Sequence, residues 1–441
     1  MGRAGVTWRH RAWVVAGITF AVLVMAAALR SSTGVLIEPV SGDLGWSVQS
    51  VSLAVTVNLV LYGLVAPFAA ALMEKFGIRR VVAGALVLMS AGMALSTTVQ
   101  QPWQLVATWG LLTGLGVGCL ALVFGAIVAG RWFVARRGLV MGVFSTAYAT
   151  GSLLFLPAIA RVSTSSGWRV AVLALAVLAL GLVPLVLLLM RERPADVGLK
   201  PYGAPADWVE PEPLDDRGIG PARVAVLRLR EASRTRAFWL LMAGFFVCGW
   251  STNGLVGTHF ISAAHDHGLP ITTGATLLAF IGIFDVVGTI GSGWLTDRFD
   301  PRVLLLVYYG LRGVSLLVVH LLWAPTVQAP MFFFVVLYGL DWVATVPPTV
   351  ALCREGFGIE RAGVVFGWVF ASHMVGAGIS AWFAAAVRES TGSYDVAWWV
   401  AGGLCLLAAA ASFVVPRGDQ LRDHDRDRDP DKDPDPELTP A

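Results

Sequence analysis

Residues 70–79 read AALMEKFGIR, and residues 293–302 read GWLTDRFDPR. At an offset of 223 positions, a leucine, an acid, a base, a phenylalanine and an arginine recur in the same order, and each stretch stands between two long apolar runs. A second repeated pattern has an offset of 225: the Arg, Gly and Gly at positions 136, 138 and 142 recur at 361, 363 and 367. Two duplicated loops at nearly one offset indicate a membrane protein built from two homologous halves.

The composition excludes a soluble globular protein. The 441 residues are 56% hydrophobic and 14% charged, and the mean hydropathy is +0.71. A chain this apolar belongs in a lipid bilayer. The net charge of +3 is small, and we expect no nucleic-acid partner. Four cysteines fall in or beside apolar runs without metal-ligand spacing, and we predict neither a metal nor a cofactor.

The apolar runs predict transmembrane helices. A helix rises about 1.5 Å per residue, so about 20 apolar residues cross the hydrocarbon. The runs are continuous, without the alternation of a membrane barrel. Twelve predicted spans cover residues 12–37, 48–73, 79–98, 103–130, 138–160, 168–190, 237–261, 272–296, 302–323, 330–352, 362–387 and 395–416.

The distribution of Lys and Arg supports this topology. With both termini in the cytoplasm, 27 of the 32 Lys and Arg residues lie in cytoplasmic segments, and three lie outside. Short cytoplasmic loops carry such an excess, and a wrong number of spans would mix the signs. The basic residues before the first run suggest a secretory signal instead, but that run is too long and the parity of the other loops requires it as a span.

The chain therefore divides into two six-helix halves. We predict a cytoplasmic N-terminus over 1–11, an N-terminal bundle over 12–190, a central cytoplasmic loop over 191–236 and a C-terminal bundle over 237–416. The tail, 417–441, alternates acids and bases with repeated Pro and has almost no apolar residues. Such a segment cannot build a core, so we expect it to be disordered.

The loop pattern and the twelve spans resemble the major facilitator superfamily of secondary transporters over residues 10–416. The family's signature loop, Gly-x-Leu-x-Asp-Arg-x-Gly-Arg-Arg, is matched in residues 70–80, with Glu74 in place of the usual Asp and Ala70 in place of the leading Gly. The resemblance implies an all-α membrane protein with twelve transmembrane helices in two pseudo-symmetric six-helix bundles. It also implies a transporter rather than an enzyme, and no Walker loop or hydrolase motif contradicts this.

The charged residues of the two loops are candidates for a cytoplasmic gate. An acid at one helix end and bases at the next form charge-assisted bonds that break when the halves rock, although a merely solvated turn is the alternative. The candidate gate residues are Glu74, Lys75, Arg79, Arg80, Asp297, Arg298 and Arg302.

Within the superfamily the chain resembles the bacterial monocarboxylate and oxalate/formate branch. The run RWF at 131–133, followed by Arg136, Arg137 and Gly138, is similar to that branch's entry to span five. Arg30 resembles the basic residue that monocarboxylate carriers place at the end of span one. Asp285 resembles their acid in span eight, where this chain has Thr289 in place of the family's Arg one turn later.

Ionisable residues within the spans are the first candidates for function, because each is costly in lipid and needs a partner or a wet cavity. Arg30 is the one charge in the first-half spans away from the span ends, and it suits an anionic substrate, an acid of the other half, or the interface. Asp285 and Asp341 are candidate proton carriers, unless Arg312 neutralises them in a structural ion pair. His373 is either a proton-relay member or a packing residue.

Uncharged polar residues complete the predicted pocket. Asn58, Tyr62, Tyr148 and Asn253 lie within spans two, five and seven, where polar groups orient small ligands. Hydrogen bonding between helices explains them equally well.

These observations predict a secondary active transporter that moves a small solute across the membrane by alternating access. We expect a small organic anion such as a monocarboxylate, coupled to protons or exchanged for another anion. The alternatives are an efflux transporter of cationic or amphipathic compounds and a transporter-like receptor. We expect a monomeric multi-pass protein of a bacterial inner membrane, with both termini cytoplasmic.

Overall fold

Helices make up nearly all of the chain in the computed structural model, which describes residues 10–209 and 219–416. A lipid bilayer offers no water to the backbone, so each crossing segment must satisfy its own N–H and C=O groups, as a helix does. Within the described ranges the β contact is a single isolated bridge between Phe133 and Tyr202. The all-α membrane fold predicted from the sequence is confirmed.

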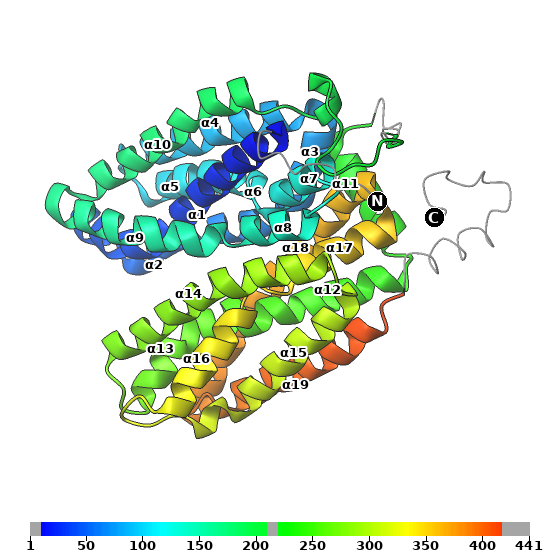
Figure 1. The fold of residues 1–441 in the computed structure, drawn as a ribbon. Coiled ribbons are helices and arrows are strands. Elements are labelled where there is room, and N and C mark those ends of the chain that lie inside the picture. The colour runs from blue at the N-terminus through cyan, green and yellow to red at the C-terminus, as the bar shows by residue number, and fades with distance from the viewer. Residues whose placement is uncertain (1–9, 210–218, 417–441) are drawn as a thin grey trace.

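The helices form two bundles that lie side by side (Figure 1). The first bundle contains α1 (Arg11–Leu44), α2 (Val48–Leu64), α3 (Ala66–Phe76), α4 (Ile78–Ser96), α5 (Pro102–Leu105), η1 (Val106–Thr113), α6 (Gly114–Cys119), α7 (Leu122–Trp132), α8 (Arg137–Ser145), α9 (Ala147–Ser166) and α10 (Trp168–Leu189). The second contains α12 (Arg236–Gly249), η3 (Trp250–Val256), α13 (Gly257–Asp266), α14 (Ile271–Thr296), α15 (Pro301–Val318), η4 (Val319–Leu321), α16 (Ala329–Asp341), α17 (Val346–Phe357), α18 (Ile359–Thr391) and α19 (Asp395–Phe413).

Within the described residues these helices give eleven candidate spans, or twelve if one bent pair counts as a single span, in line with the twelve predicted. Eleven are long and apolar enough to cross a membrane as continuous or nearly continuous helices. The twelfth is the pair formed by α2 and α3, which is bent by 55°. Pro67 at the start of α3 fits this bend, because proline lacks the N–H that a continuing helix would use.

Spans four, seven and ten are irregular near their middle. Spans four and seven contain π-helical stretches, η1 and η3, in which the backbone bonds run to the fifth residue before rather than the fourth. Span ten is interrupted between Asp341, the last residue of α16, and Val346, the first of α17. Pro347 and Pro348 follow at once, so two N–H donors are missing there. Such irregular backbone within a membrane requires polar partners from the protein.

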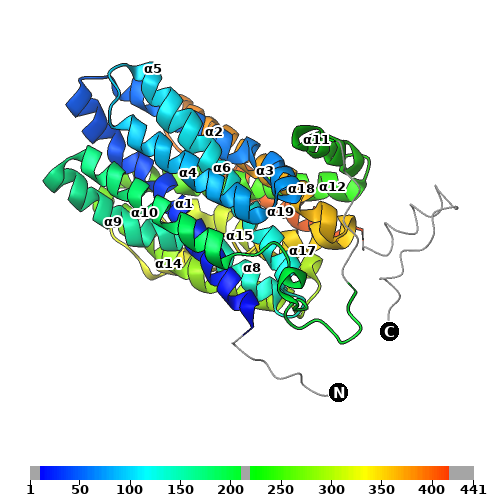
Figure 2. The ribbon, with the colours of Figure 1, turned by 90° about the horizontal axis from the view of Figure 1, so that it is seen from above.

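The segment that joins the bundles crosses one end of the molecule. It contains the short helix η2 (Pro194–Val197) and the amphipathic α11 (Pro221–Ala232). Tyr202 is held against the first bundle by a backbone bond of 2.8 Å to the carbonyl of Trp132 and by ring contact with Trp13. Helix α11 packs against α3 and α18, which belong to different bundles (Figure 2). We call this end of the molecule, where α1 begins and α19 ends, the linker side.

The predicted segment boundaries at 12, 191 and 237 stay predictions. The tail expected to be disordered lies outside the described residues, as do residues 1–9.

Candidate functional site

The two bundles make backbone contact on the linker side, where α8 packs along α14. A Cβ atom on Gly138 would collide with the carbonyl oxygen of Gly293, and a Cβ on Gly293 with that of Gly138. A Cβ on Gly142 would lie 2.7 Å from the carbonyl oxygen of Thr289. Only glycine permits this approach, and the glycines at 138 and 142 in the duplicated pattern are therefore explained by contact between the halves.

Asp297 closes the same contact. Its carboxylate accepts a hydrogen bond of 2.6 Å from the N–H of Gly138 and one of 3.0 Å from the N–H of Leu139. These donors are the unsatisfied first-turn N–H groups of α8, where a negative charge is favoured. The sequence predicted that this acid would take part in an acid–base bond; the bonds found for it here go to a helix N-terminus in the other half.

A pseudo-symmetric contact joins α18 to α3 and α7. A Cβ on Gly367 would lie 2.6 Å from the Cα of Pro67, and one on Gly363 would lie 2.8 Å from the side chain of Ile127. The Glu74 carboxylate reaches within 3.9 Å of that Gly363 position. The two acids of the duplicated loops thus occupy corresponding places, and each faces the N-terminal part of a helix of the opposite half.

The basic gate candidates bind elsewhere. Lys75 donates to the carbonyl of Ile219 in the linker at 2.8 Å, and the N–H of Arg79 donates to Glu192 at 3.0 Å. Arg302 pairs with Asp300 in its own half, and the Arg298 guanidinium lies 3.9 Å from the ring centroid of Trp294. Arg80 is exposed on α4.

A cavity of about 300 Å³ lies at this seam. Its walls come from both bundles, and linker residues such as Arg193, Lys200 and Trp208 form part of them. Both basic and acidic side chains line it, including Arg131, Arg354, Glu74, Asp297 and Glu360.

A second, smaller cavity of about 90 Å³ lies between the bundles near the middle of the spans. Both halves supply its walls, and aromatic side chains are frequent among them. Its lining includes Arg30, Tyr62 and Ser145 from the first half, and Phe245, Cys248, Thr252, Asn253, Trp342, Val343, Phe370 and His373 from the second. We call it the central cavity.

Arg30 and Tyr62 form the first-half wall of the central cavity. The Arg30 guanidinium carbon lies 4.5 Å from the centroid of the Tyr62 ring, and Tyr62 meets Phe370 of the other half edge-on, with centroids 5.5 Å apart. Arg30 bears the one formal charge among the described residues that line this cavity. The arrangement orients a guanidinium, whose donors match a carboxylate, toward the space between the halves.

His373 and Asn253 form the facing wall. Nε2 of His373 lies 3.2 Å from the amide nitrogen of Asn253, and the imidazole stacks on Phe370 with 6.0 Å between centroids. Nδ1 is buried without a partner of hydrogen-bonding geometry among the described residues, although the Cys248 thiol lies close enough to interact with the ring. A small polar ligand in the cavity would therefore meet hydrogen-bonding groups of both halves.

The other two predicted pocket residues are Asn58 and Tyr148. Asn58 is 1% exposed, and its amide donates a 3.0 Å bond to the carbonyl of Trp109, one of the carbonyls of the π-helical stretch η1. It does not line either cavity described above. The side chain of Tyr148 lies outside the described part of the structure.

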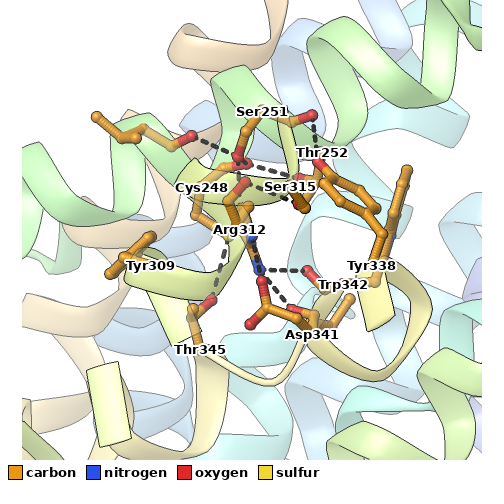
Figure 3. A network of polar contacts seen from close by, with 12 residues as sticks. Cys248, Ser251, Thr252, Tyr309, Arg312, Ser315, Tyr338, Asp341, Trp342 and Thr345 are labelled. Atoms are coloured by element: carbon orange, nitrogen blue, oxygen red, sulfur yellow. Dashed lines mark hydrogen bonds and ion pairs between the residues drawn. The ribbon is translucent and has the colours of Figure 1, made fainter. Parts of the chain in front are cut away.

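Arg312 is the centre of a buried polar cluster in the second half (Figure 3). Its Nε donates a 2.6 Å bond to Asp341, and its Nη1 reaches Cys248 at 3.3 Å and Ser251 at 3.4 Å. Its Nη2 donates to the carbonyls of Asp341 and Trp342, the latter at 3.2 Å. Arg312 and Asp341 are 1% and 6% exposed. The structural ion pair that the sequence offered as one alternative is thus present in the geometry.

Asp285 lies apart from this ion pair and is 3% exposed. Its carboxylate accepts bonds from the hydroxyl of Thr289 at 2.7 Å and from the N–H of Val343 at 3.1 Å. Thr289, which replaces the Arg of the resembling carriers, thus solvates Asp285 with a neutral group. Asp285 does not line the central cavity, but Val343 does.

Sequence reasoning missed the interruption of span ten and the residues that hold it. Ser292 donates a 2.5 Å bond to the carbonyl of Ala344, and Cys248 lies 3.2 Å from the hydroxyl of Thr345. The Pro pair at 347 and 348 is a signal that predicts such a break. No signal identified Ser292, because a serine in a span is usually bonded to its own helix. The described residues contain no group of three or more His, Cys, Asp or Glu placed to bind a metal.

Two membrane-embedded bundles that enclose a cavity lined from both sides define a class of protein, the membrane transporters. The chain matches the family model of the Major Facilitator Superfamily over residues 18–381 and 293–437, and it belongs to that family. Its members are transporters and not enzymes.

Known relatives and solved structures agree with this family. The chain is 25% identical to the uncharacterized MFS-type transporter YcxA of Bacillus subtilis, covering 87% of this chain and 90% of the relative. It is 27% identical to monocarboxylate transporter 11 of Mus musculus, over 92% and 87% of the two chains. A structure of the transporter XylE matches with a TM-score of 0.70 over 94% and 98% at 14% identity. The human organic anion transporter MFSD10 matches at 0.66 over 91% and 99%, with 16% identity.

Proposed function

We propose that the protein is a secondary active transporter that carries a small organic anion, a monocarboxylate, across a bacterial inner membrane. Arg30 carries this proposal, because it places a single positive charge on the wall of the central cavity, against Tyr62. A carboxylate would accept paired hydrogen bonds from this guanidinium, and the apolar and aromatic lining suits the rest of a small ligand. The monocarboxylate transporters among the relatives support the same substrate class.

Alternating access would work through the linker-side contacts. The close approach of Gly138 to Gly293 and the bonds of Asp297 to α8 support a state that is closed on the linker side. Release of these contacts would let the halves rock and open the central cavity on the linker side. The excess of Lys and Arg in the loops on this side supports a cytoplasmic orientation for it.

Asp285 is the best-placed proton carrier of the predicted set. Its hydrogen-bond donors are neutral, whereas Asp341 is bonded to the Arg312 guanidinium. The charged groups that act on Asp285 are Arg312 and Asp341, both in the neighbouring cluster. A carboxylate buried beside neutral donors gains or loses its proton with little disturbance of an ion pair. His373 is the second candidate, because it lines the central cavity itself.

Uptake into proteoliposomes tests the substrate class. We would measure a panel of labelled monocarboxylates, dicarboxylates and organic cations, with and without a pH gradient. Arg30→Ala should lower the affinity for a transported monocarboxylate about tenfold to a hundredfold, the range for lost hydrogen bonds to a charged group. Arg30→Lys should recover part of it, because lysine keeps the charge and loses the paired geometry.

Arg161→Ala is the matched control, since it removes an exposed arginine that lies outside both cavities and outside the gate candidates. Unchanged transport of every anion by Arg30→Ala would refute the anion site. Efflux of cations is the alternative, and a cation in this cavity would face Arg30. Transport of cations, but of none of the anions in the panel, would establish cation efflux as the function.

A further inference from the structure

The interruption of span ten connects the buried cluster to the central cavity. Its four residues, 342–345, form turns in which the N–H groups of Trp342 and Ala344 bond to the third residue before rather than the fourth. Side chains from neighbouring helices bind other backbone groups of this segment. Asp285 of α14 accepts from the N–H of Val343 at 3.1 Å, Ser292 of α14 donates to the carbonyl of Ala344 at 2.5 Å, and Arg312 of α15 donates to the carbonyl of Trp342 at 3.2 Å. Each of three successive residues in the interruption is thus held by one buried side chain.

Two of these three residues line the central cavity. Trp342 and Val343 are partly buried cavity-wall residues, and Val346, the first residue of α17, lies beside them. The residues that hold them are more deeply buried: Asp285 is 3%, Ser292 is 1% and Arg312 is 1% exposed. None of the three lines the cavity. They contact the wall from behind, through main-chain atoms.

The helices are closely packed beside the interruption. A Cβ atom on Gly288 of α14 would collide with the carbonyl of Leu340, and one on Gly339 would lie 2.8 Å from the carbonyl oxygen of Ile281. Helix α14 therefore touches the backbone of α16 directly before the interruption. A displacement of α14 would be transmitted to the wall, because close-packed contacts leave no slack.

We propose that Ser292, together with Asp285 and Arg312, is a positioning residue that sets substrate affinity by fixing the backbone of residues 342–344 and hence the Trp342 wall of the central cavity. This rests on the proposed function of the cavity. The ligand concerned is the small monocarboxylate of that proposal, with its apolar part against Trp342. Ser292 is the informative member, because it carries no charge and takes no part in the ion pair.

The test is Ser292→Ala in purified protein and proteoliposomes. The change leaves the carbonyl of Ala344 without its donor, and we expect the KM for a transported monocarboxylate to rise about three- to tenfold while the maximal rate changes less than twofold. Ser292→Thr keeps the hydroxyl and should restore the wild-type KM. Ser412→Ala is the matched control, since Ser412 is 5% exposed and its hydroxyl bonds to its own helix at Ala408.

A double-mutant cycle separates positioning from general destabilisation. If Ser292 acts through the Trp342 wall, its effect on KM should largely vanish in a Trp342→Ala background. Equal KM values for Ser292→Ala and Ser412→Ala, or full additivity with Trp342→Ala, would overturn the proposal. If Ser292→Ala does not fold, Ser292→Cys, a weaker donor, takes its place with the same direction expected.

Failure of the proposed function has a different signature. A wild-type protein that transports no monocarboxylate refutes the function itself. A wild-type protein that transports one in an Arg30-dependent manner, with a KM insensitive to Ser292, refutes only the positioning role.

Discussion

The two halves share a scaffold but differ in where they place charge. In the first half, the spans contain Arg30, half-buried on the wall of the central cavity. In the second half, Asp285, Arg312 and Asp341 are buried behind the wall and bonded to one another or to the interrupted span ten. The duplicated loops and glycines let the two halves pack against each other. The halves differ in their charged residues: the first half has a charge that faces the ligand cavity, and the second half has a buried charged cluster.

The largest expected difference is in the free energy of unfolding that is lost when Arg312 or Arg30 is replaced. Arg312→Met leaves Asp341 buried without its partner, and we expect a loss of about 3–5 kcal/mol in the free energy of unfolding. Arg30→Met removes a stacking contact with Tyr62 and should cost about 1 kcal/mol. Thermal unfolding of the purified protein in detergent measures both. Equal losses would contradict the division between a structural and a ligand-facing charge.

The coupling role should depend on the second half alone. Asp285→Asn keeps an oxygen that accepts from Thr289 and Val343 but cannot carry the charge, so uptake driven by a pH gradient should fall to the level seen without a gradient. Exchange of internal for external substrate should continue. Asp341→Asn is the comparison, and it should affect stability more than pH dependence, because Asp341 is paired with Arg312. Retention of pH-driven uptake by Asp285→Asn would exclude this carboxyl as the coupling group.

The two gate acids should each stabilise the state that is closed on the linker side. Asp297 makes two bonds to the N-terminus of α8, and its replacement by Ala should cost about 1 kcal/mol of the closed contact, as the loss of a helix cap does. That cost shifts the population about fivefold toward the state open on the linker side. Maleimide labelling of a cysteine at Ala351, on the wall of the linker-side cavity, reports the shift. The four native cysteines would first be replaced.

Glu74→Ala tests the pseudo-symmetric contact, where the Glu74 carboxylate lies 3.9 Å from the position of a Cβ on Gly363. It should increase labelling as well, because the acid faces the N-terminal part of α18, where a negative charge is favoured. Unchanged labelling by Glu74→Ala would restrict the lock to the Asp297 contact.

The smallest effect concerns the face opposite the linker side. The Trp168 indole and the Arg169 guanidinium donate to Asp43, at 3.1 and 2.5 Å, and these bonds lower the pKa of Asp43 below its usual range. A depressed carboxyl pKa contributes stability above the unfolded-state pKa, and this contribution is lost as the pH falls through the folded-state pKa. The side chains of Asp43 and Arg169 are both exposed, so this contribution to stability is small.

Melting temperatures of the wild type and Asp43→Asn should therefore differ slightly at pH 6 and converge below about pH 4. Asp207→Asn, an exposed linker acid, serves as the control. A difference that persists at acidic pH would mean that the Asp43 bonds do not depend on its charge.

Much of the fold was predictable because lipid imposes a simple rule. Apolar runs of about 20 residues must become helices, and loop charge sets their orientation. The predicted interval 330–352 shows the limit, since continuous hydropathy gave no sign that the helix stops at Asp341 and resumes at Val346. Only the Pro pair indicated it, and the interruption is tolerated because side chains of α14 and α15 bind its backbone.

The site was predicted in part. Arg30, Tyr62, Asn253 and His373 line the central cavity together, although they come from four spans. Asn58 belongs to the same predicted set and binds the carbonyl of Trp109 instead. The same two criteria, a polar or charged side chain and a position within a span, selected all of these residues. They do not predict the direction in which each side chain points, because that depends on how the helices are rotated in the bundle.

The amino-acid sequence by itself determines that this is a duplicated membrane protein with twelve spans, because hydropathy and the spacing of charged loops are properties of the linear sequence. Tertiary structure alone decides which buried charge faces the cavity and which binds another charge. Arg30 and Arg312 are both arginines within apolar segments of the sequence. Only the packing of the helices places Arg30 beside Tyr62 and Arg312 beside Asp341.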